Sequence, residues 1–223
     1  MGEHSGGRGR PGGPGRRAVV LGGAAAALGV GGLLSRETLE RWWWQHSGAE
    51  VERVEGEVDH PGAEWVPAST ANYRRANRPR DYAIDRVVVH MPEATYAITL
   101  QVFQDPSHGA STHYVVRSAD GHVAQLAREL DVAYHAGNFA FNERSIGIEH
   151  EGWADDPAYL TDAMYESSAR LVAGICARYE IPIDREHILG HNEVPDVVRI
   201  CPGPHWDWDR YLDLVRREAD RGR

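Results

Sequence analysis

Cysteine is scarce in this chain, since its 223 residues include only Cys176 and Cys201. Two cysteines can form one disulfide at most, which excludes a small disulfide-stabilised scaffold. Positive charge is also in deficit, because 24 Lys+Arg residues are outnumbered by 33 Asp+Glu residues. A general nucleic-acid binder needs a basic face to meet phosphates, so we expect no nucleic-acid partner.

The charge is unevenly placed along the chain. Residues 1–35 carry four Arg and one Glu, a net charge of +3, so the remainder must carry −12 to give the total of −9. Arg16 and Arg17 are adjacent, and the 17 residues that follow, 18–34, contain no charge. A basic stretch before a short apolar one is the layout of a signal peptide, and the paired arginines are typical of the twin-arginine type. Residues 1–34 therefore predict an exported, cell-envelope or extracellular protein.

Residues 18–34 could instead stay in place as a membrane anchor. As a helix they would span about 25 Å, slightly less than the roughly 30 Å hydrocarbon core of a bilayer. Trp42, Trp43 and Trp44 follow shortly after, and tryptophan favours the membrane interface. No clean small-residue cleavage site follows Leu34, so a cleaved signal and a retained anchor both stay open.

Residues 35–64 are predicted to be a linker, and residues 65–217 a single folded domain. Glu, Asp, Gly and Pro dominate much of the linker, and no apolar period is sustained there. The whole chain is 42% hydrophobic and 26% charged, which is ordinary for a globular protein. We expect one domain and a monomer.

Strand and helix patterns are interspersed within this domain. The run Ile84–Met91 is β-branched and predicts a buried strand, and Ser145–Glu151 alternates as a second strand. Asp120-Gly121 predicts a hairpin turn, and Thr161 can cap a long helix. Further predicted elements are a helix at Ile98–Gln104, a short strand at Ile188–Leu189 and a helix at Trp206–Arg217. This order predicts an α/β fold with a central mixed β-sheet flanked by helices.

Two histidines and a cysteine are candidate metal ligands. His90 ends the most hydrophobic strand, where a polar ring must find a partner. His191 follows another short strand, and Cys201 stands before the turn Pro202-Gly203-Pro204. Two His and one Cys suit zinc, whose catalytic sites keep a fourth position open. Spacing alone leaves other interpretations open: a hydrogen-bonded core His, a loop His and a buried free thiol.

Six blocks in order resemble a known family: VVVH, STHYVVRSADGHVAQL, AYHAGN, SIGIEHEG, ILGHNEV and CPGPHWDW. They look like the blocks of type 2 N-acetylmuramoyl-L-alanine amidases, over roughly residues 65–212. The resemblance implies a mixed sheet flanked by helices and one zinc ion. It also implies hydrolysis of the amide between N-acetylmuramic acid and L-alanine, with peptidoglycan or muropeptides as substrate. Some relatives only bind peptidoglycan, so a non-catalytic binding module is the alternative.

The resemblance also implies roles for individual residues. The zinc ligands of the family fall on His90, His191 and Cys201. The general base falls on Glu149, although Glu151 lies on the same face of its strand and periodicity cannot choose between them. The residue that stabilises the oxyanion is often Lys in the family, and Arg199 occupies that position here. Arg keeps the charge but aims its planar donors differently.

Three further residues complete the predictions. His135 and Asn138 match a family block that commonly reads Trp-His-Ala-Gly, so they are expected to contact the glycan or the peptide. A disulfide between Cys176 and Cys201 is the competing hypothesis for Cys201, because it would consume the proposed ligand.

Overall fold

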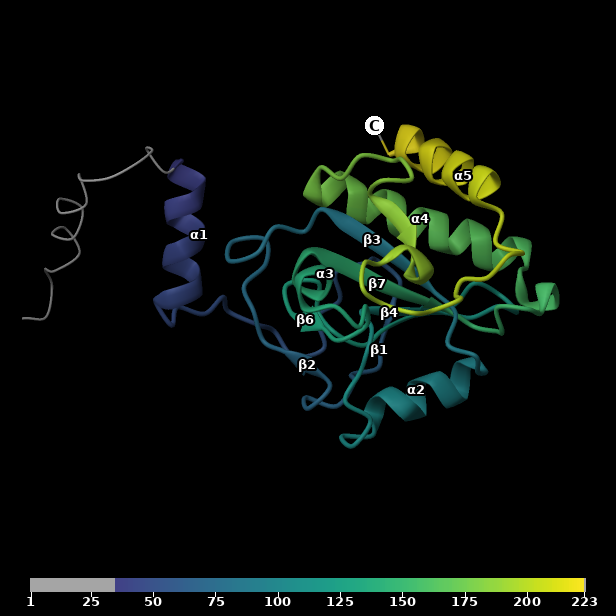
Figure 1. The fold of residues 1–223 in the computed structure, drawn as a ribbon, viewed down its shortest axis with the longest axis horizontal. Coiled ribbons are helices and arrows are strands. Elements are labelled where there is room, and N and C mark those ends of the chain that lie inside the picture. Colours follow the sequence, from purple (N-terminus) through teal and green to yellow (C-terminus); the bar gives the residue numbers. More distant parts are fainter. Residues whose placement is uncertain (1–34, 223) are drawn as a thin grey trace, which may run out of the picture. The chain divides into compact units, whose positions relative to one another are not determined.

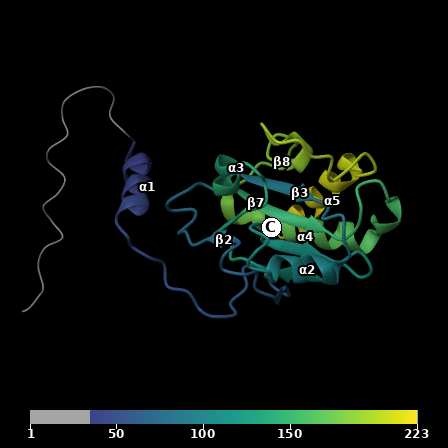
Figure 2. The ribbon, with the colours of Figure 1, turned by 60° about the horizontal axis from the view of Figure 1, so that its bottom comes forward.

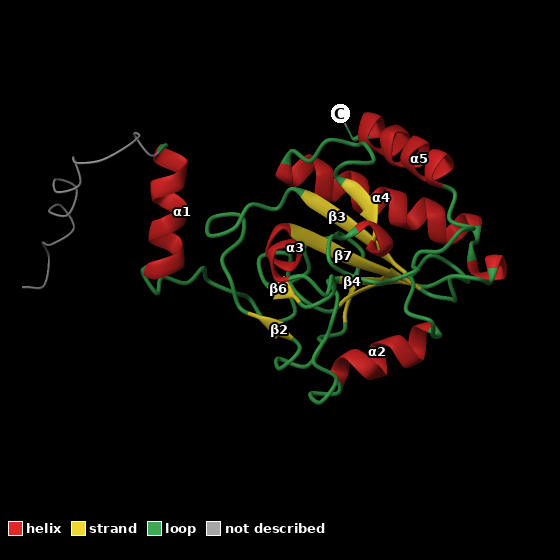
Figure 3. Cartoon of the chain, in the orientation of Figure 1, coloured by secondary structure: helices red, strands yellow, loops and turns green. Residues whose placement is uncertain are grey.

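The computed structural model describes residues 35–222, so the predicted signal or anchor segment lies outside the described residues. The compact unit begins at Arg36. Its centre is a six-stranded sheet in the order β1-β5-β4-β7-β3-β8 (Figures 1 and 3). All neighbouring strands are parallel except β4 and β5. The strands are β1 Glu64–Trp65, β3 Arg86–His90, β4 Tyr114–Val116, β5 Val123–Gln125, β7 Ser145–His150 and β8 Ile188–Gly190.

Helices cover both faces of this mixed sheet, which confirms the predicted fold class. The long helices α4 (Asp162–Tyr179) and α5 (Trp208–Arg221) lie together on one face, and α2 (Tyr96–Gln104) lies on the opposite side (Figures 1 and 2). The remaining elements are α1 Arg36–His46, α3 Phe139–Arg144, the 3-10 turns η1 Pro157–Tyr159 and η2 His191–Glu193, and the antiparallel pair β2 Tyr73–Arg74 with β6 Val132–Ala133. Among the described residues, no helix has the length and apolar character that crossing a membrane requires.

The alternation of β7 decides which of its side chains reach the main core. Ile146 and Ile148 are fully buried in the cluster formed with α4 and α5. Gly147 and Glu149 therefore point to the other face, because successive side chains of a strand alternate. Thr161 caps α4 by accepting a hydrogen bond from the Met164 amide, as predicted.

The predicted linker contains structure that its composition did not indicate. Residues 36–46 form α1, and the chain after it makes polar contacts with the domain. Arg53 pairs with Asp131 at 2.9 Å, and Asp59 pairs with Arg128 at 2.8 Å. Such contacts join residues far apart in the sequence, so no local apolar period announces them.

Candidate metal centre and active-site pocket

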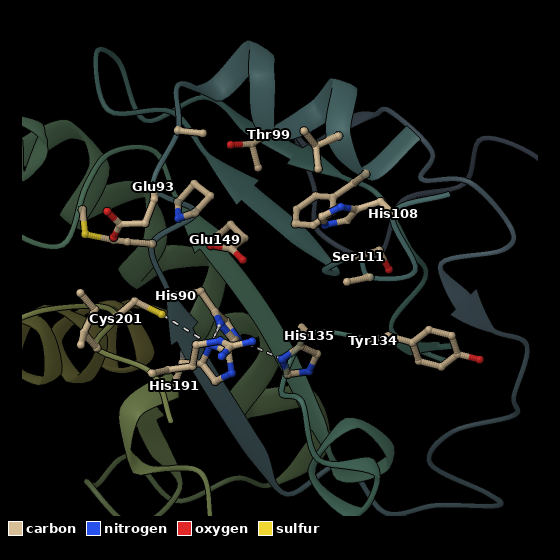
Figure 4. Close-up of a pocket in the computed structure, with 18 residues that line it drawn as sticks. His90, Glu93, Thr99, His108, Ser111, Tyr134, His135, Glu149, His191 and Cys201 are labelled. Carbon is tan, nitrogen blue, oxygen red and sulfur yellow. Dashed lines mark hydrogen bonds between the residues drawn. The ribbon is translucent and has the colours of Figure 1, made fainter. Parts of the chain in front are cut away.

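The pocket lies at the carboxyl ends of the parallel strands β3 and β7. His90 and Glu149 are the last paired residues of these two strands and lie opposite each other in register. In open α/β sheets, this end of the strands is where ligands bind. The cavity measures about 330 Å³, and its wall includes Thr99 and Phe103 of α2 together with His108 (Figure 4).

Three candidate metal ligands converge in this pocket. His90 comes from β3, His191 from the start of η2, and Cys201 from the loop after it. His90 Nδ1 lies 3.0 Å from His191 Nδ1, which in turn lies 3.5 Å from Cys201 Sγ. One ligand atom from each of the three residues falls within 4.8 Å of the others. The structure thus brings together residues that are 101 and 10 positions apart in the sequence.

Close backbone packing places His191 and Cys201 beside each other. The Asn192 amide donates to the Cys201 carbonyl at 3.0 Å. Gly190 precedes His191, and a Cβ there would lie 2.7 Å from Pro202 and 2.4 Å from Asn192 Oδ1. Only glycine therefore lets β8 pass this close to the loop that carries the thiol.

The donor set fits a tetrahedral metal such as zinc. Bonds of about 2.0–2.3 Å to two nitrogens and one sulfur would separate these ligand atoms by roughly 3.3–3.7 Å. The distances from His191 Nδ1 to His90 Nδ1 and to Cys201 Sγ, 3.0 and 3.5 Å, are close to this spacing. His191 Nε2 faces the Ala136 carbonyl at 3.2 Å. Because a carbonyl only accepts, Nε2 carries the proton and Nδ1 presents a lone pair to the ligand cluster. These three side chains could therefore hold one metal ion.

Burial keeps both histidines unprotonated at neutral pH. Burial, with the neighbouring His191, holds the pKa of His90 well below its ordinary value. Burial lowers the pKa of His191 to about 4. Burial, with the nearby Glu149, raises the pKa of the Cys201 thiol to about 11. A metal ion would thus meet two free imidazole nitrogens and would displace the thiol proton on binding.

Glu149, and not Glu151, lines the pocket. The Glu149 side chain is buried, and its Oε2 has no hydrogen-bond partner among residues 35–222. Burial, with the nearby Glu93, raises the pKa of Glu149 to about 8. Both oxygens of Glu151 are instead used, since Oε1 accepts from the Tyr96 amide and Oε2 from the Ser118 amide. The structure therefore separates two carboxylates that the strand pattern could not.

Arg199 lines the rim of the pocket on the exposed loop before Cys201. Its guanidinium donates only to the neighbouring Val198 carbonyl, at 3.0 Å. Val198 and Ile200 beside it are exposed apolar side chains. A positive charge with loose local contacts can reorient toward a bound substrate.

His135 lines the pocket, but Asn138 does not. Asn138 caps α3 by accepting from the Phe141 amide, and its amide group donates to the Pro195 carbonyl. The Asn138 side chain thus has two contacts within the protein, and its predicted contact with substrate stays a prediction. Both ring nitrogens of His135 are also engaged inside the protein, with His90 and Ser145.

The competing hypothesis of a disulfide is not supported, because Cys176 and Cys201 are both free and buried. Cys176 lies in α4 within the main core, as its place in the apolar stripe indicated. Sequence reasoning missed Glu93, which also lines the pocket. Glu93 adopts a left-handed conformation with φ 56° just after β3, a turn that no sequence signal marked.

Known proteins are similar to this chain in sequence and in fold. The family model described as N-acetylmuramoyl-L-alanine amidase matches residues 80–204. N-acetylmuramoyl-L-alanine amidase A of Achromobacter lyticus is 34% identical over 175 residues, covering 71% of this chain and 96% of the relative. The 1,6-anhydro-N-acetylmuramyl-L-alanine amidase AmpD of Haemophilus influenzae is 36% identical over 112 residues, covering 48% of this chain and 59% of the relative.

Solved structures agree with these sequence matches. The crystal structure of a Se-Met AmpD derivative superposes with a TM-score of 0.58 at 28% identity, covering 74% of this chain and 99% of that one. The family model spans more than half of the chain, and the Achromobacter lyticus enzyme is matched over nearly its whole length. This chain therefore belongs to the N-acetylmuramoyl-L-alanine amidase family, the type 2 amidases.

Proposed function

We propose that this protein is a zinc-dependent N-acetylmuramoyl-L-alanine amidase that cleaves the amide between N-acetylmuramic acid and L-alanine of peptidoglycan or muropeptides. One observation carries the proposal: His90, His191 and Cys201 converge in the same pocket as a buried carboxylate, Glu149, that has a free oxygen. A module that only binds the cell wall would gain nothing from burying that carboxylate unpaired, because its desolvation is costly.

Each residue has a step that its position allows. Zinc, when bound by the three ligands, would supply a Lewis acid that polarises the scissile carbonyl and activates water. Glu149 takes a proton from the attacking water and passes it to the L-alanine nitrogen as the C–N bond breaks. Burial raises the pKa of Glu149 to about 8, and a cation held by the three ligands would lower this pKa and favour the ionised base. Arg199, at the rim of the pocket, supplies positive charge that would stabilise the oxyanion.

The decisive experiment incubates the purified protein with cell walls, with and without a chelator. We expect chelator-sensitive release of stem peptides with free L-alanine N-termini. The variant Glu149→Gln should lose at least about 100-fold in rate while its zinc content stays at that of wild type. Release that persists in chelator would refute zinc dependence. Binding to cell walls without any release would instead support the non-catalytic module.

We also propose that the protein is exported and held at the outer face of the membrane. Leu39, Trp42 and Trp43 form an exposed stripe on α1, each at least half exposed. The opposite side of α1 contacts the domain, where Arg41 donates to the Pro79 carbonyl and Gln45 to the Asp81 carbonyl. Supporting this placement, tryptophan favours the bilayer interface and the uncharged residues 18–34 directly precede the helix. A mature N-terminus beyond Leu34, measured by mass spectrometry, would exclude the anchor.

A further inference from the structure

The His90 ring also contacts a histidine outside the candidate ligand set, His135. The two rings are perpendicular, with an interplanar angle of 88° and centroids 5.1 Å apart. His90 Nε2 lies 3.0 Å from His135 Nδ1 (Figure 4). On its other side, His135 Nε2 lies 3.1 Å from Ser145 Oγ. His135 therefore joins the first candidate ligand to the first residue of β7.

We propose that His135 is a positioning residue that fixes the tautomer and orientation of His90 for metal binding. This inference rests on the proposed zinc site, and it replaces the expected role of His135 in contacting substrate. Both of its nitrogens are used within the protein, so neither is left to recognise a sugar or peptide group.

The direction of each hydrogen bond follows from a single anchored proton. Ser145 Oγ donates its proton to the Phe141 carbonyl, so this oxygen can only accept from His135 Nε2. A neutral imidazole carries one proton, hence His135 Nδ1 has a lone pair and accepts from His90 Nε2. His90 Nδ1 is then left without a proton and faces the ligand cluster.

The consequence is a pair of lone pairs that oppose each other. His191 Nδ1 is also unprotonated, because its Nε2 donates to the Ala136 carbonyl. The two Nδ1 atoms lie 3.0 Å apart, an arrangement that is repulsive until a cation lies between or beside them. The relay through His135 thus holds His90 in the form that a metal requires, at a cost that metal binding relieves.

The relay is held in place by tight packing. His135 is 8% exposed, and a Cβ on Gly147 would lie 2.4 Å from its Cγ. Only glycine at this position of β7 leaves room for the ring. The Asn142 side chain accepts from the amides of His135 and Ala136, which fixes the backbone beneath the ring. Two residues of β7 therefore position the His135 ring: Gly147 leaves room for it, and Ser145 accepts its hydrogen bond.

A matched pair of variants tests the relay. In His135→Asn the amide oxygen can still accept from His90 Nε2, whereas His135→Leu has a similar size and no acceptor. Zinc affinity is measured by competition with a chromophoric chelator, on protein whose metal-free fold is checked by circular dichroism. We expect affinity to fall roughly 10–100-fold in His135→Leu, with partial rescue in His135→Asn. The control is His108→Asn, which alters another histidine of the pocket wall and should leave zinc affinity within about twofold.

The absorption spectrum of the cobalt-substituted protein is a second measurement, and a general loss of stability would not change it. The ligand-field spectrum reports the geometry around the metal, so we expect an altered spectrum in His135→Leu and a near wild-type one in His135→Asn. Equal zinc affinity and identical cobalt spectra in the wild type and His135→Leu would overturn the inference. If His135→Leu does not fold, Ser145→Ala decides in its place: it removes the acceptor for His135 Nε2, together with the bond to the Phe141 carbonyl, and should also lower zinc affinity and alter the cobalt spectrum. Failure of the wild type to bind zinc would instead refute the proposed function.

Discussion

Among the residues that line the described pocket, Arg199 is the only arginine, and no lysine is present. The whole chain contains no lysine, so all 24 of its Lys+Arg residues are arginine. Arg199 reaches the pocket from an exposed loop and contacts only the Val198 carbonyl through its guanidinium. Its contribution is therefore expected in the reaction and not in the stability of the fold.

Replacing Arg199 tests that contribution. We expect Arg199→Ala to lower kcat about 100-fold, because it removes one donor that stabilises the oxyanion. Arg199→Lys keeps the charge and should stay within about tenfold of wild type. The kinetics of muropeptide cleavage, with zinc content measured in parallel, check both values. A wild-type kcat in Arg199→Ala would show that the oxyanion is stabilised elsewhere.

The secondary-structure elements show how far local sequence signals reach. The β-branched run ending at His90, the Asp120-Gly121 turn and the Thr161 cap are local features, and the corresponding strand, hairpin and helix are present. Asn138 carried a local signal too, because asparagine is favoured at helix N-termini. The structure confirms that capping role at the start of α3.

The segment that precedes β1 could not be predicted in the same way. Asp59 and Arg128 are 69 residues apart, and no periodicity relates them. Burial alone would raise the pKa of Asp59, but hydrogen bonds from Arg128 and from the Glu129 amide outweigh burial and lower it below its ordinary value. Charge pairs of this kind help to hold residues 48–64 against the domain.

This pair predicts a pH-dependent stability of the segment. Because the folded pKa of Asp59 lies below the unfolded value near 3.8, the pair stabilises fully above that value. The contribution is lost as pH falls through the lower folded pKa. We expect Asp59→Asn to cost about 2 kcal/mol of unfolding free energy at neutral pH, and less near pH 3, as measured by urea denaturation.

A neighbouring carboxylate provides the control for Asp59→Asn. Glu57 also pairs with Arg128, but its side chain is 48% exposed, against 15% for Asp59. Exposed ion pairs contribute about 0–1 kcal/mol, so Glu57→Gln should have a small effect. Equal losses in both variants, or a cost for Asp59→Asn that does not change with pH, would contradict this account.

At the scale of the whole molecule, the site is assembled by the sheet. His90 and Glu149 meet only because β3 and β7 pair in parallel register, and His191 arrives by way of β8 on the other side of β3. Sequence spacing could not predict this meeting, since the ligands are separated by most of the domain. The ordered family blocks did predict that these residues meet, because the strand pairing of the family's fold is already known. Glu93 and the His135 relay were missed, as they depend on side-chain directions that only coordinates give.

A metal bound by such distant ligands should stabilise the entire domain. Ligand that binds only the folded state adds RT ln(1 + [L]/Kd), which is about 4 kcal/mol at a thousandfold excess over Kd. For a domain of this size, each kcal/mol shifts Tm by roughly 2–4 °C. We therefore expect a chelator to lower Tm by about 10 °C, measured by differential scanning calorimetry.

Two variants separate metal binding from catalysis in the same calorimetric experiment. Glu149→Gln should retain the full chelator-dependent shift, because Glu149 is placed beside the ligand cluster and is not one of its three members. His191→Ala should abolish the shift and melt near the chelated wild type, since it removes a ligand that joins β8 to the Cys201 loop. If the chelator leaves the Tm of the wild type unchanged, the three side chains do not hold a structural link between these strands, and zinc binding would have to be sought elsewhere. A shift lost in Glu149→Gln would instead make that carboxylate a ligand and remove the general base from the proposed mechanism.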